Sequence, residues 1–458
     1  MIRYYSTNRD LESPAGVTPF REKVSFKDAL LMGQAPDEGL FMPDGIPHLT
    51  PKNILALKGK PYRETALLVT YAFLHDEIDR TVLEGIVEDS YPFKVPLERV
   101  SGRHYVMRLD QGPTASFKDF AARMMARLMS YFSKGKPRLN VLVATSGDTG
   151  SAVGEAFKGV DGIDVCILYP RCEVSGRQKK QLDTIGENVR ALSIDGKFDD
   201  CQNLVKEAFA DPKLAHLNFT SANSINFGRI LPQMVYYVYA YAQLADGKEE
   251  IVVSVPSGNF GNALGCEYTR RMGLPLQKLV MPTNENDEFP DFLATGRYEK
   301  VSPSRACLSN AMNVGHPSNL ARFFELYGGT VDRKGTVHRI PDIEEIRRRI
   351  FSVSVTDEMT RQCIKDVYER YGTILEPHGA VGWRGLELYC GKANDVPLAV
   401  SLETAHPAKF PEEIVKLLGI VPEMPESMQG LDERTGEPVE LSARYEDFKE
   451  FLIGNLRV

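Results

Sequence analysis

Lys118 stands near the start of a predicted helix, and its amine could act as a nucleophile. A Gly-Pro turn at residues 112–113 precedes it, Ser116 is a suitable helix N-cap, and Asp119 stands in the position of a capping box. The start of a helix disfavours positive charge, so the pKa of the Lys118 amine should be lowered. A neutral amine can form an imine with a carbonyl compound. The alternative is a surface lysine whose methylene stem covers apolar neighbours.

The residues around Lys118 place apolar side chains at intervals of three and four. This spacing is typical of a helix that buries one face. The members of that face are Phe117, Phe120, Ala121, Met124, Met125, Leu128 and Phe132.

A glycine-rich loop at residues 257–262, Ser-Gly-Asn-Phe-Gly-Asn, follows an apolar strand and precedes a helix. Glycines let a backbone approach a ligand closely, and a helix start presents unpaired N–H groups. The loop therefore resembles a phosphate cradle. It lacks the Gly-Lys-Ser/Thr of a Walker loop and the spacing of a dinucleotide-binding fingerprint. An ordinary tight turn is the alternative.

A second polar loop, Thr-Ser-Gly-Asp-Thr-Gly at 145–150, also leads from a strand into a helix. Its hydroxyl and N–H groups suit a carboxylate ligand. Asp148 would repel such an anion, so its direction matters. The alternative is that Asp148 or Thr149 caps the helix.

Two further loops carry polar side chains. In the segment 402–410, Thr404 could point inward as a neutral hydrogen-bond partner, and Glu403 would then face the other way. His406 is either structural or catalytic. The segment 220–228 is polar and uncharged, but loops are commonly built of such residues.

Strands and helices alternate from residue 106 onward, which predicts parallel sheets with right-handed crossovers. We expect an α/β protein with two doubly wound parallel-sheet domains and an N-terminal helical extension. The expected units are an N-terminal domain over 1–95, a large cofactor-binding domain over 96–130 and 227–458, and a small domain over 131–226. In open α/β sheets, ligands bind beyond the carboxyl ends of the strands, where these loops lie.

Composition excludes several functions for this chain of 458 residues. Its net charge of −7 and its lack of a basic patch argue against nucleic-acid binding. No apolar run reaches the length of a membrane span, and residues 1–7 lack the apolar core of a signal peptide. The seven cysteines are scattered, and the eight histidines show no metal-ligand spacing. We expect reduced thiols, a cytoplasmic location and no metal.

Taken together, four motifs in this order resemble the threonine synthases. They are Ser-Phe-Lys-Asp at 116–119, Thr-Ser-Gly-Asp-Thr-Gly at 145–150, Pro-Ser-Gly-Asn-Phe-Gly-Asn at 256–262 and Glu-Thr-Ala-His-Pro-Ala-Lys-Phe at 403–410. These enzymes belong to the fold-type-II (tryptophan-synthase-β-like) pyridoxal-phosphate enzymes. The N-terminal pieces at 24–26 and 39–41 are similar to the long, bacterial and fungal form.

The resemblance implies a role for each motif. Lys118 would be the Schiff-base lysine, and Thr404 would contact the pyridine nitrogen. The cradle for the cofactor phosphate would be Gly258, Asn259, Phe260, Gly261 and Asn262. Asp148 stands where many relatives carry Asn beside the cofactor's 3′ oxygen, so a carboxylate there must accept a proton or turn away.

The substrate contacts implied by the resemblance fall in the smaller predicted domain. Thr145, Ser146 and Thr149 match the loop that holds the substrate carboxylate. The contacts to the substrate phosphate are expected among Ser175, Arg177, Gln178, Asn223, Ser224 and Asn226.

The implied activity is conversion of O-phospho-L-homoserine and water to L-threonine and phosphate. Lys118 would move protons among the substrate carbons, and the neutral Thr404 should leave the pyridine nitrogen largely unprotonated. The open alternatives are another fold-type-II lyase, such as a serine/threonine dehydratase or a threonine-synthase-like phospholyase, and a scaffold without cofactor. We expect a small-molecule substrate and a monomer or homodimer.

Overall fold

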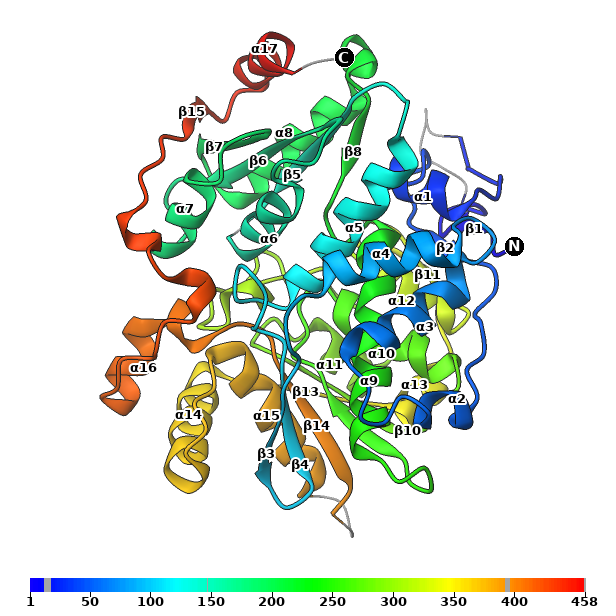
Figure 1. Cartoon of the computed structure of the whole chain (residues 1–458), viewed down its shortest axis with the longest axis vertical. Coiled ribbons are helices and arrows are strands. Elements are labelled where there is room, and N and C mark those ends of the chain that lie inside the picture. The colour runs from blue at the N-terminus through cyan, green and yellow to red at the C-terminus, as the bar shows by residue number, and fades with distance from the viewer. Residues whose placement is uncertain (12–17, 146, 392–395, 457–458) are drawn as a thin grey trace.

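Two β-sheets lie on either side of a central buried helix, α5 (Lys118–Ser133) (Figure 1). The computed structural model describes residues 1–11, 18–145, 147–391 and 396–456. The larger sheet has the strand order β13-β10-β9-β14-β4-β3. Its neighbours are parallel except β3 and β4 at one edge. The strands are β3 (Leu97–Ser101), β4 (His104–Arg108), β9 (Ile251–Ser254), β10 (Leu276–Thr283), β13 (Ile350–Ser354) and β14 (Leu398–Glu403).

The smaller sheet is entirely parallel, in the order β15-β7-β6-β5-β8. Every residue of β5 and β6 is buried, as continuous apolar runs predict for a sheet covered on both faces. The strands are β5 (Leu139–Ala144), β6 (Ile163–Pro170), β7 (Val189–Asp195), β8 (Phe219–Ser221) and β15 (Val439–Ser442). Helices α6 (Asp148–Phe157), α7 (Gly176–Asp183) and α8 (Phe198–Ala210) accompany it. The larger sheet, parallel except at its β3–β4 edge, and the parallel smaller sheet have the predicted α/β class.

An N-terminal unit packs against the central helix. It comprises β1 (Tyr4–Ser6), α1 (Phe26–Met32), β2 (Phe41–Pro43), α2 (Pro51–Leu55), α3 (Tyr62–Leu74) and α4 (Arg80–Ser90). The ring of Tyr62 packs edge-on against Phe120 of α5, with ring centroids 5.4 Å apart, and against Tyr239 of α9 (Val235–Leu244), with ring centroids 5.3 Å apart. These aromatic contacts fix one side of α5, and so the position of Lys118 at its first turn.

The larger sheet carries most of the remaining elements. They are α10 (Gly261–Arg271), α11 (Glu288–Thr295), α12 (Leu320–Leu326), α13 (Ile343–Arg349), α14 (Asp357–Tyr371), α15 (Pro377–Cys390) and α16 (Pro411–Leu418), the ribbon β11 (Thr330–Val331) with β12 (Val337–Arg339), and the 3-10 turns η2 (Phe227–Arg229), η3 (Leu231–Met234), η4 (Asn310–Met312) and η5 (Pro407–Lys409). Among the described residues, no helix is both long and apolar enough to cross a bilayer.

The C-terminal segment returns to the smaller sheet (Figure 1). Strand β15 pairs with β7, and Phe448 and Leu452 of α17 (Tyr445–Asn455) join the apolar cluster that contains Leu204 of α8. The sequence expectation assigns residues 227–458 to the larger unit. Because β15 completes an open edge of the smaller sheet, we propose that residues 439–455 belong to the small unit instead.

Candidate active site

Lys118 is the first residue of α5, and its side chain is 14% exposed. The loop before it is held to the loop after β14 by two backbone hydrogen bonds: Phe117 N donates to Thr404 O, and His406 N donates to Ala115 O. The predicted cap is wrong. The backbone of Ser116 forms a β-bridge with Ala405, its hydroxyl caps nothing, and Phe117 is the N-cap residue. Long-range pairing replaces the local cap, and it joins two of the four motifs.

Asp119 has a different role from that of a capping-box partner. Its two oxygens accept from the backbone N–H of Thr114 at 2.9 Å and from the Thr114 hydroxyl at 2.7 Å. Burial raises the pKa of Asp119 to about 6. Asp119 thus folds the turn that precedes Lys118.

The pKa of the Lys118 amine is lowered, as the sequence predicts, but the main cause is burial. The Asp148 carboxylate opposes this effect, whereas the cations of Lys409 and Arg229 add to it. Position at the helix start was the predicted cause. The structure adds burial in the protein interior, which is the first of the causes that lower this pKa.

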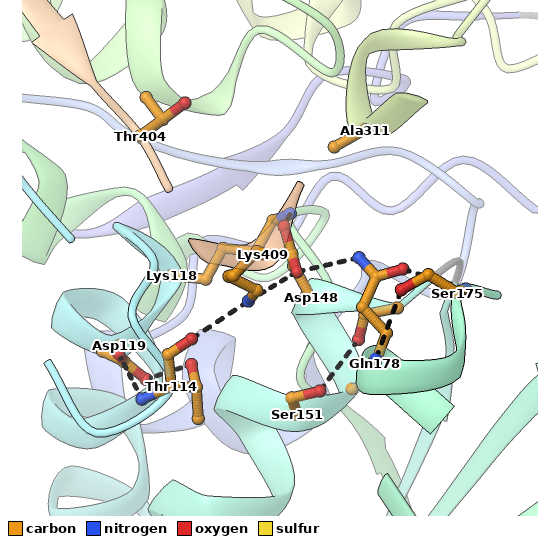
Figure 2. Close-up of polar contacts among 12 residues, drawn as sticks. Thr114, Lys118, Asp119, Asp148, Ser151, Ser175, Gln178, Ala311, Thr404 and Lys409 are labelled. Carbon is orange, nitrogen blue, oxygen red and sulfur yellow. Dashed lines mark hydrogen bonds and ion pairs between the residues drawn. The ribbon is translucent and has the colours of Figure 1, made fainter. Parts of the chain in front are cut away.

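Asp148 is the acidic centre of the site (Figure 2). Its Oδ1 lies 2.7 Å from Lys409 Nζ and accepts from Gln178 Nε2 at 3.0 Å, and its Oδ2 lies 3.8 Å from Lys118 Nζ. Burial alone would raise the pKa of Asp148, but the two ammonium groups outweigh burial and hold it well below its usual range. Lys409 therefore neutralises the Asp148 carboxylate in place, and the expectation that a carboxylate beside the cofactor's 3′ oxygen accepts a proton or turns away stays a prediction.

Sequence reasoning missed Lys409. Its side chain is 1% exposed, and its Nζ also donates to the backbone oxygen of Thr114 at 3.0 Å. A lysine in a Pro-Ala-Lys-Phe segment is usually solvated. The signal that could have revealed it is Asp148 itself, because a buried carboxylate requires a cationic partner.

The Thr145–Gly150 loop is organised by the threonine side chain. Thr145 Oγ1 accepts from the N–H groups of Gly147 and Gly150 at 3.0 and 2.9 Å. Thr149 lies half-buried in the first turn of α6, and Ser146 lies outside the described residues.

Ser175 caps α7 by accepting from Gln178 N, and Gln178 Oε1 accepts from Ser175 N in return. This box aims the Gln178 amide at Asp148 (Figure 2). Arg177 Nη1 donates to Ala408 O at 2.5 Å, next to Lys409. The structure therefore brings α7 against the motif at 403–410.

The predicted residues at 223–226 form a turn between the two sheets. Asn226 binds the backbone of Leu30 and Ser221 through Nδ2, and of Gly228 through Oδ1. The Ser224 backbone oxygen accepts from the side chains of Asn319 and the fully buried Arg322. Asn223 Nδ2 donates to Ala144 O, whereas its buried Oδ1 has no partner within the described chain. These contacts favour a structural role for Asn226.

The loop at 258–262 fits a phosphate group. Asn262 is 7% exposed; its Oδ1 accepts from the hydroxyls of Tyr236 and Tyr237, and its Nδ2 has no partner among the described residues. A Cβ on Gly258 would lie 2.9 Å from the Cα of Met312. Phe260 has φ 61°, and Gly261 begins α10, whose first N–H groups have no intrahelical acceptor. The unpaired Asn262 amide lies at the start of α10, beside the closely packed backbone of Gly258, and this arrangement suits an anion.

Thr404 lies beyond the end of β14 and meets a carboxylate that the sequence analysis missed. Its hydroxyl donates to Glu376 Oε1 at 3.3 Å, and Glu376 Oε2 binds His378 Nδ1 at 2.5 Å. His378 Nε2 accepts from Ala311 N–H, so the imidazole hydrogen is on Nδ1. Glu403, also 0% exposed, accepts from Glu376 N. His406 Nδ1 accepts from Ala408 N, the structural alternative for this residue.

Arg229 is a buried cation that the sequence analysis also missed. Its Nη1 donates to Ala222 O at 2.7 Å, and its buried Nε has no partner among the described residues. Burial lowers the pKa of this guanidinium to about 10. An arginine that is only 4% exposed and keeps an unpaired donor suits an anionic ligand.

Comparison with family models covers almost the whole chain. The model for "Pyridoxal-phosphate dependent enzyme" matches residues 92–397. Models for "Threonine synthase N terminus" and "Threonine synthase, C-terminal" match residues 3–91 and 379–452.

Individual relatives agree with these matches. Threonine synthase of Haemophilus influenzae is 38% identical over 89% of this chain and 91% of its own. That of Pseudomonas aeruginosa is 37% identical over 94% of both chains. The crystal structure of PLP-bound threonine synthase from Brucella melitensis covers 100% of both chains with a TM-score of 0.90 at 34% identity. The α/β class is thus confirmed by a solved structure.

Proposed function

This chain belongs to the threonine synthase family of pyridoxal-phosphate-dependent enzymes, and we propose that it converts O-phospho-L-homoserine and water to L-threonine and phosphate at Lys118. The observation that carries the proposal is a buried amine with a lowered pKa, in a chain that also has an unsatisfied anion cradle at Asn262. The alternatives of a dehydratase, a phospholyase and a scaffold without cofactor are not favoured by these relatives.

Pyridoxal phosphate would be held at three places. Lys118 would bind its aldehyde carbon, the loop from Gly258 to Asn262 would hold its phosphate, and Thr404 would face its ring nitrogen. When bound, the cofactor supplies an electron sink for carbanions next to the substrate nitrogen. Asn262 Nδ2 gives the phosphate a neutral donor that the protein leaves unpaired.

The protein's own groups would then move protons and orient the substrate. The Lys118 amine, once neutral, can take a proton from the substrate Cα and return protons along the chain as phosphate leaves from Cγ and water adds at Cβ. Asp148 stays ionised between two lysines, so it can accept hydrogen bonds but not donate one.

The substrate carries two anionic groups, and the site offers separate partners for them. The Thr145 hydroxyl and the first turn of α6 suit the carboxylate. Arg229 Nε, which has no partner among the described residues, is a cationic donor for an anion, and Asn223, Ser224 and Ser175 stay candidates for the phosphate. Gln178 and Arg177 are already engaged with Asp148 and Ala408, so they contribute by positioning.

The test uses the full-length chain loaded with pyridoxal phosphate. After borohydride reduction, mass spectrometry of peptides should find the cofactor on Lys118, and the unreduced protein should form equal amounts of threonine and phosphate from phosphohomoserine. Lys118→Ala should abolish both, whereas Lys134→Ala, which changes an exposed lysine at the far end of α5, should change neither. Modification at another lysine, or phosphate release without threonine, would overturn the proposal.

We also propose a reducing, cytoplasmic setting and a monomer or homodimer. All seven cysteines are unpaired in the structure: four are buried (Cys166, Cys201, Cys266 and Cys363), two are half-buried (Cys307 and Cys390) and Cys172 is exposed. Unpaired thiols are usual in reducing compartments.

A further inference from the structure

Two lysines share the single carboxylate of Asp148. Lys409 Nζ lies 2.7 Å from Oδ1, whereas Lys118 Nζ lies 3.8 Å from Oδ2. A close ammonium–carboxylate hydrogen bond spans about 2.7–2.9 Å, so Lys409 makes one and Lys118 does not. All three side chains are mostly buried, with exposed fractions of 1% for Lys409, 3% for Asp148 and 14% for Lys118.

The partners of Asp148 come from both sheets. Asp148 begins α6 and Gln178 lies on α7, which both accompany the smaller sheet, whereas Lys409 lies in η5, just after strand β14 of the larger one. Lys409 is fixed a second time, because its Nζ donates to the Thr114 backbone oxygen (Figure 2). Its position therefore does not depend on Asp148 alone.

We propose that Lys409 is a positioning residue: by occupying Asp148, it prevents this carboxylate from capturing Lys118 in a fixed ion pair. The inference rests on the proposed role of Lys118 as the reactive amine. An amine that must become neutral is hindered by an unshared carboxylate close by, since that anion stabilises the ammonium form.

The charges that face Lys118 come from four elements. They are Asp148 of α6, Lys409 of η5, Arg229 of η2 and Glu376, which caps α15. The two anions raise the pKa of the Lys118 amine and the two cations lower it, while burial is the largest single cause of its lowered value. Removing Lys409 would leave the anions in excess and Asp148 with Lys118 as its near cation. Removing Asp148 would leave the two cations in excess and so favour the neutral Lys118 amine.

The test measures the ionisation of Lys118 directly, in the full-length chain without cofactor. Reductive methylation is followed as a function of pH, and the peptide that contains Lys118 is quantified by mass spectrometry. The midpoint should rise by roughly one pH unit in Lys409→Met and should fall in Asp148→Asn. The double variant should lie between the two, and Lys409→Arg, which keeps the charge, should remain near the parent.

A purely structural role for Lys409 would lower the melting temperature of Lys409→Met without this pattern of shifts. An unchanged or lower midpoint in Lys409→Met would overturn the proposal. If Lys409→Met does not fold, Lys409→Gln, which also removes the charge, takes its place, and its midpoint must rise for the proposal to stand. The labelling needs neither cofactor nor substrate, so a failure to make threonine would count against the proposed function only.

Discussion

Thr404 donates its hydroxyl to Glu376, and the same carboxylate binds the His378 ring. The two oxygens of Glu376 also accept the N–H groups of His378 and Gly379 at the start of α15. With four donors around it, Glu376 acts only as an acceptor, so the Thr404 hydroxyl hydrogen points to Glu376. Glu376 therefore orients the Thr404 hydroxyl, which is the group expected to face the cofactor ring.

Thr404→Val should weaken cofactor binding because it removes this hydroxyl from both Glu376 and the ring. We expect a loss of about 1 kcal/mol in the free energy of unfolding, the usual worth of one hydrogen bond, and a several-fold higher Kd for pyridoxal phosphate. Thr404→Ser is the matched control, since it keeps the hydroxyl. Equal Kd values for the two variants, measured by fluorescence titration, would contradict the assignment of Thr404.

Asn262→Asp tests the phosphate cradle with almost no change of shape. The new carboxylate can still accept from Tyr236 and Tyr237, but it places a negative charge where Nδ2 now stands. Repulsion of the phosphate should raise the Kd of pyridoxal phosphate at least tenfold, or about 1.4 kcal/mol. Binding of pyridoxal, which lacks the phosphate, should change far less, and this comparison separates a cradle from a general packing site.

Arg229→Gln should raise the KM for phosphohomoserine because it removes a buried cation with an unpaired Nε. A hydrogen bond to a charged group is worth about 1.5–3 kcal/mol, which predicts a KM increase of roughly tenfold or more. Arg229→Lys keeps the charge and should lose less. Steady-state kinetics with melting curves give the answer, and an unchanged KM in a folded Arg229→Gln would remove Arg229 from the substrate site.

The buried strands and the helix of Lys118 could be predicted because they depend on local patterns. The runs at 139–144 and 163–170 are apolar throughout, and the face of α5 repeats at helical spacing. Ser116 could not be placed in the same way. Instead of capping the helix, Ser116 pairs its backbone with Ala405, which is almost three hundred residues away in the chain.

The neutralisation of Asp148 was hidden for a similar reason. Lys409 reaches Asp148 only when the two sheets are assembled, and no pattern around residue 409 indicates burial. The edge strand β15 also escaped prediction, because Val-Glu-Leu-Ser is short and half-exposed and its partner β7 lies far back in the sequence. Local sequence patterns thus do not predict the contacts that form between the two sheets at this site.

Gly147→Ala should destabilise the loop before α6. Gly147 has φ 133°, a conformation that only glycine adopts easily, and a Cβ there would lie 2.6 Å from the Gln178 side chain. We expect a loss of about 1–3 kcal/mol in unfolding free energy, since strain of this kind has that cost. Gly176→Ala, at an open position in α7, is the control and should cost little. Similar losses in both variants, by urea unfolding, would contradict the argument.

Glu288 should make stability fall as pH rises through neutrality. Burial raises its pKa to about 8, and its Oε2 has no partner among the described residues. In the folded state the carboxyl keeps its proton up to that pH, whereas the unfolded chain releases it near its ordinary value of about 4.3. The stability from this group is therefore complete below that ordinary value and is lost by about pH 8, at up to about 1.4 kcal/mol per pH unit. Glu288→Gln cannot ionise, so the fall in unfolding free energy between pH 5 and 8 should be smaller in this variant by a few kcal/mol.

The measurement is urea unfolding at a series of pH values, with the exposed Glu299→Gln as control. Parallel curves for the parent and Glu288→Gln would show that Glu288 is ionised in the folded protein.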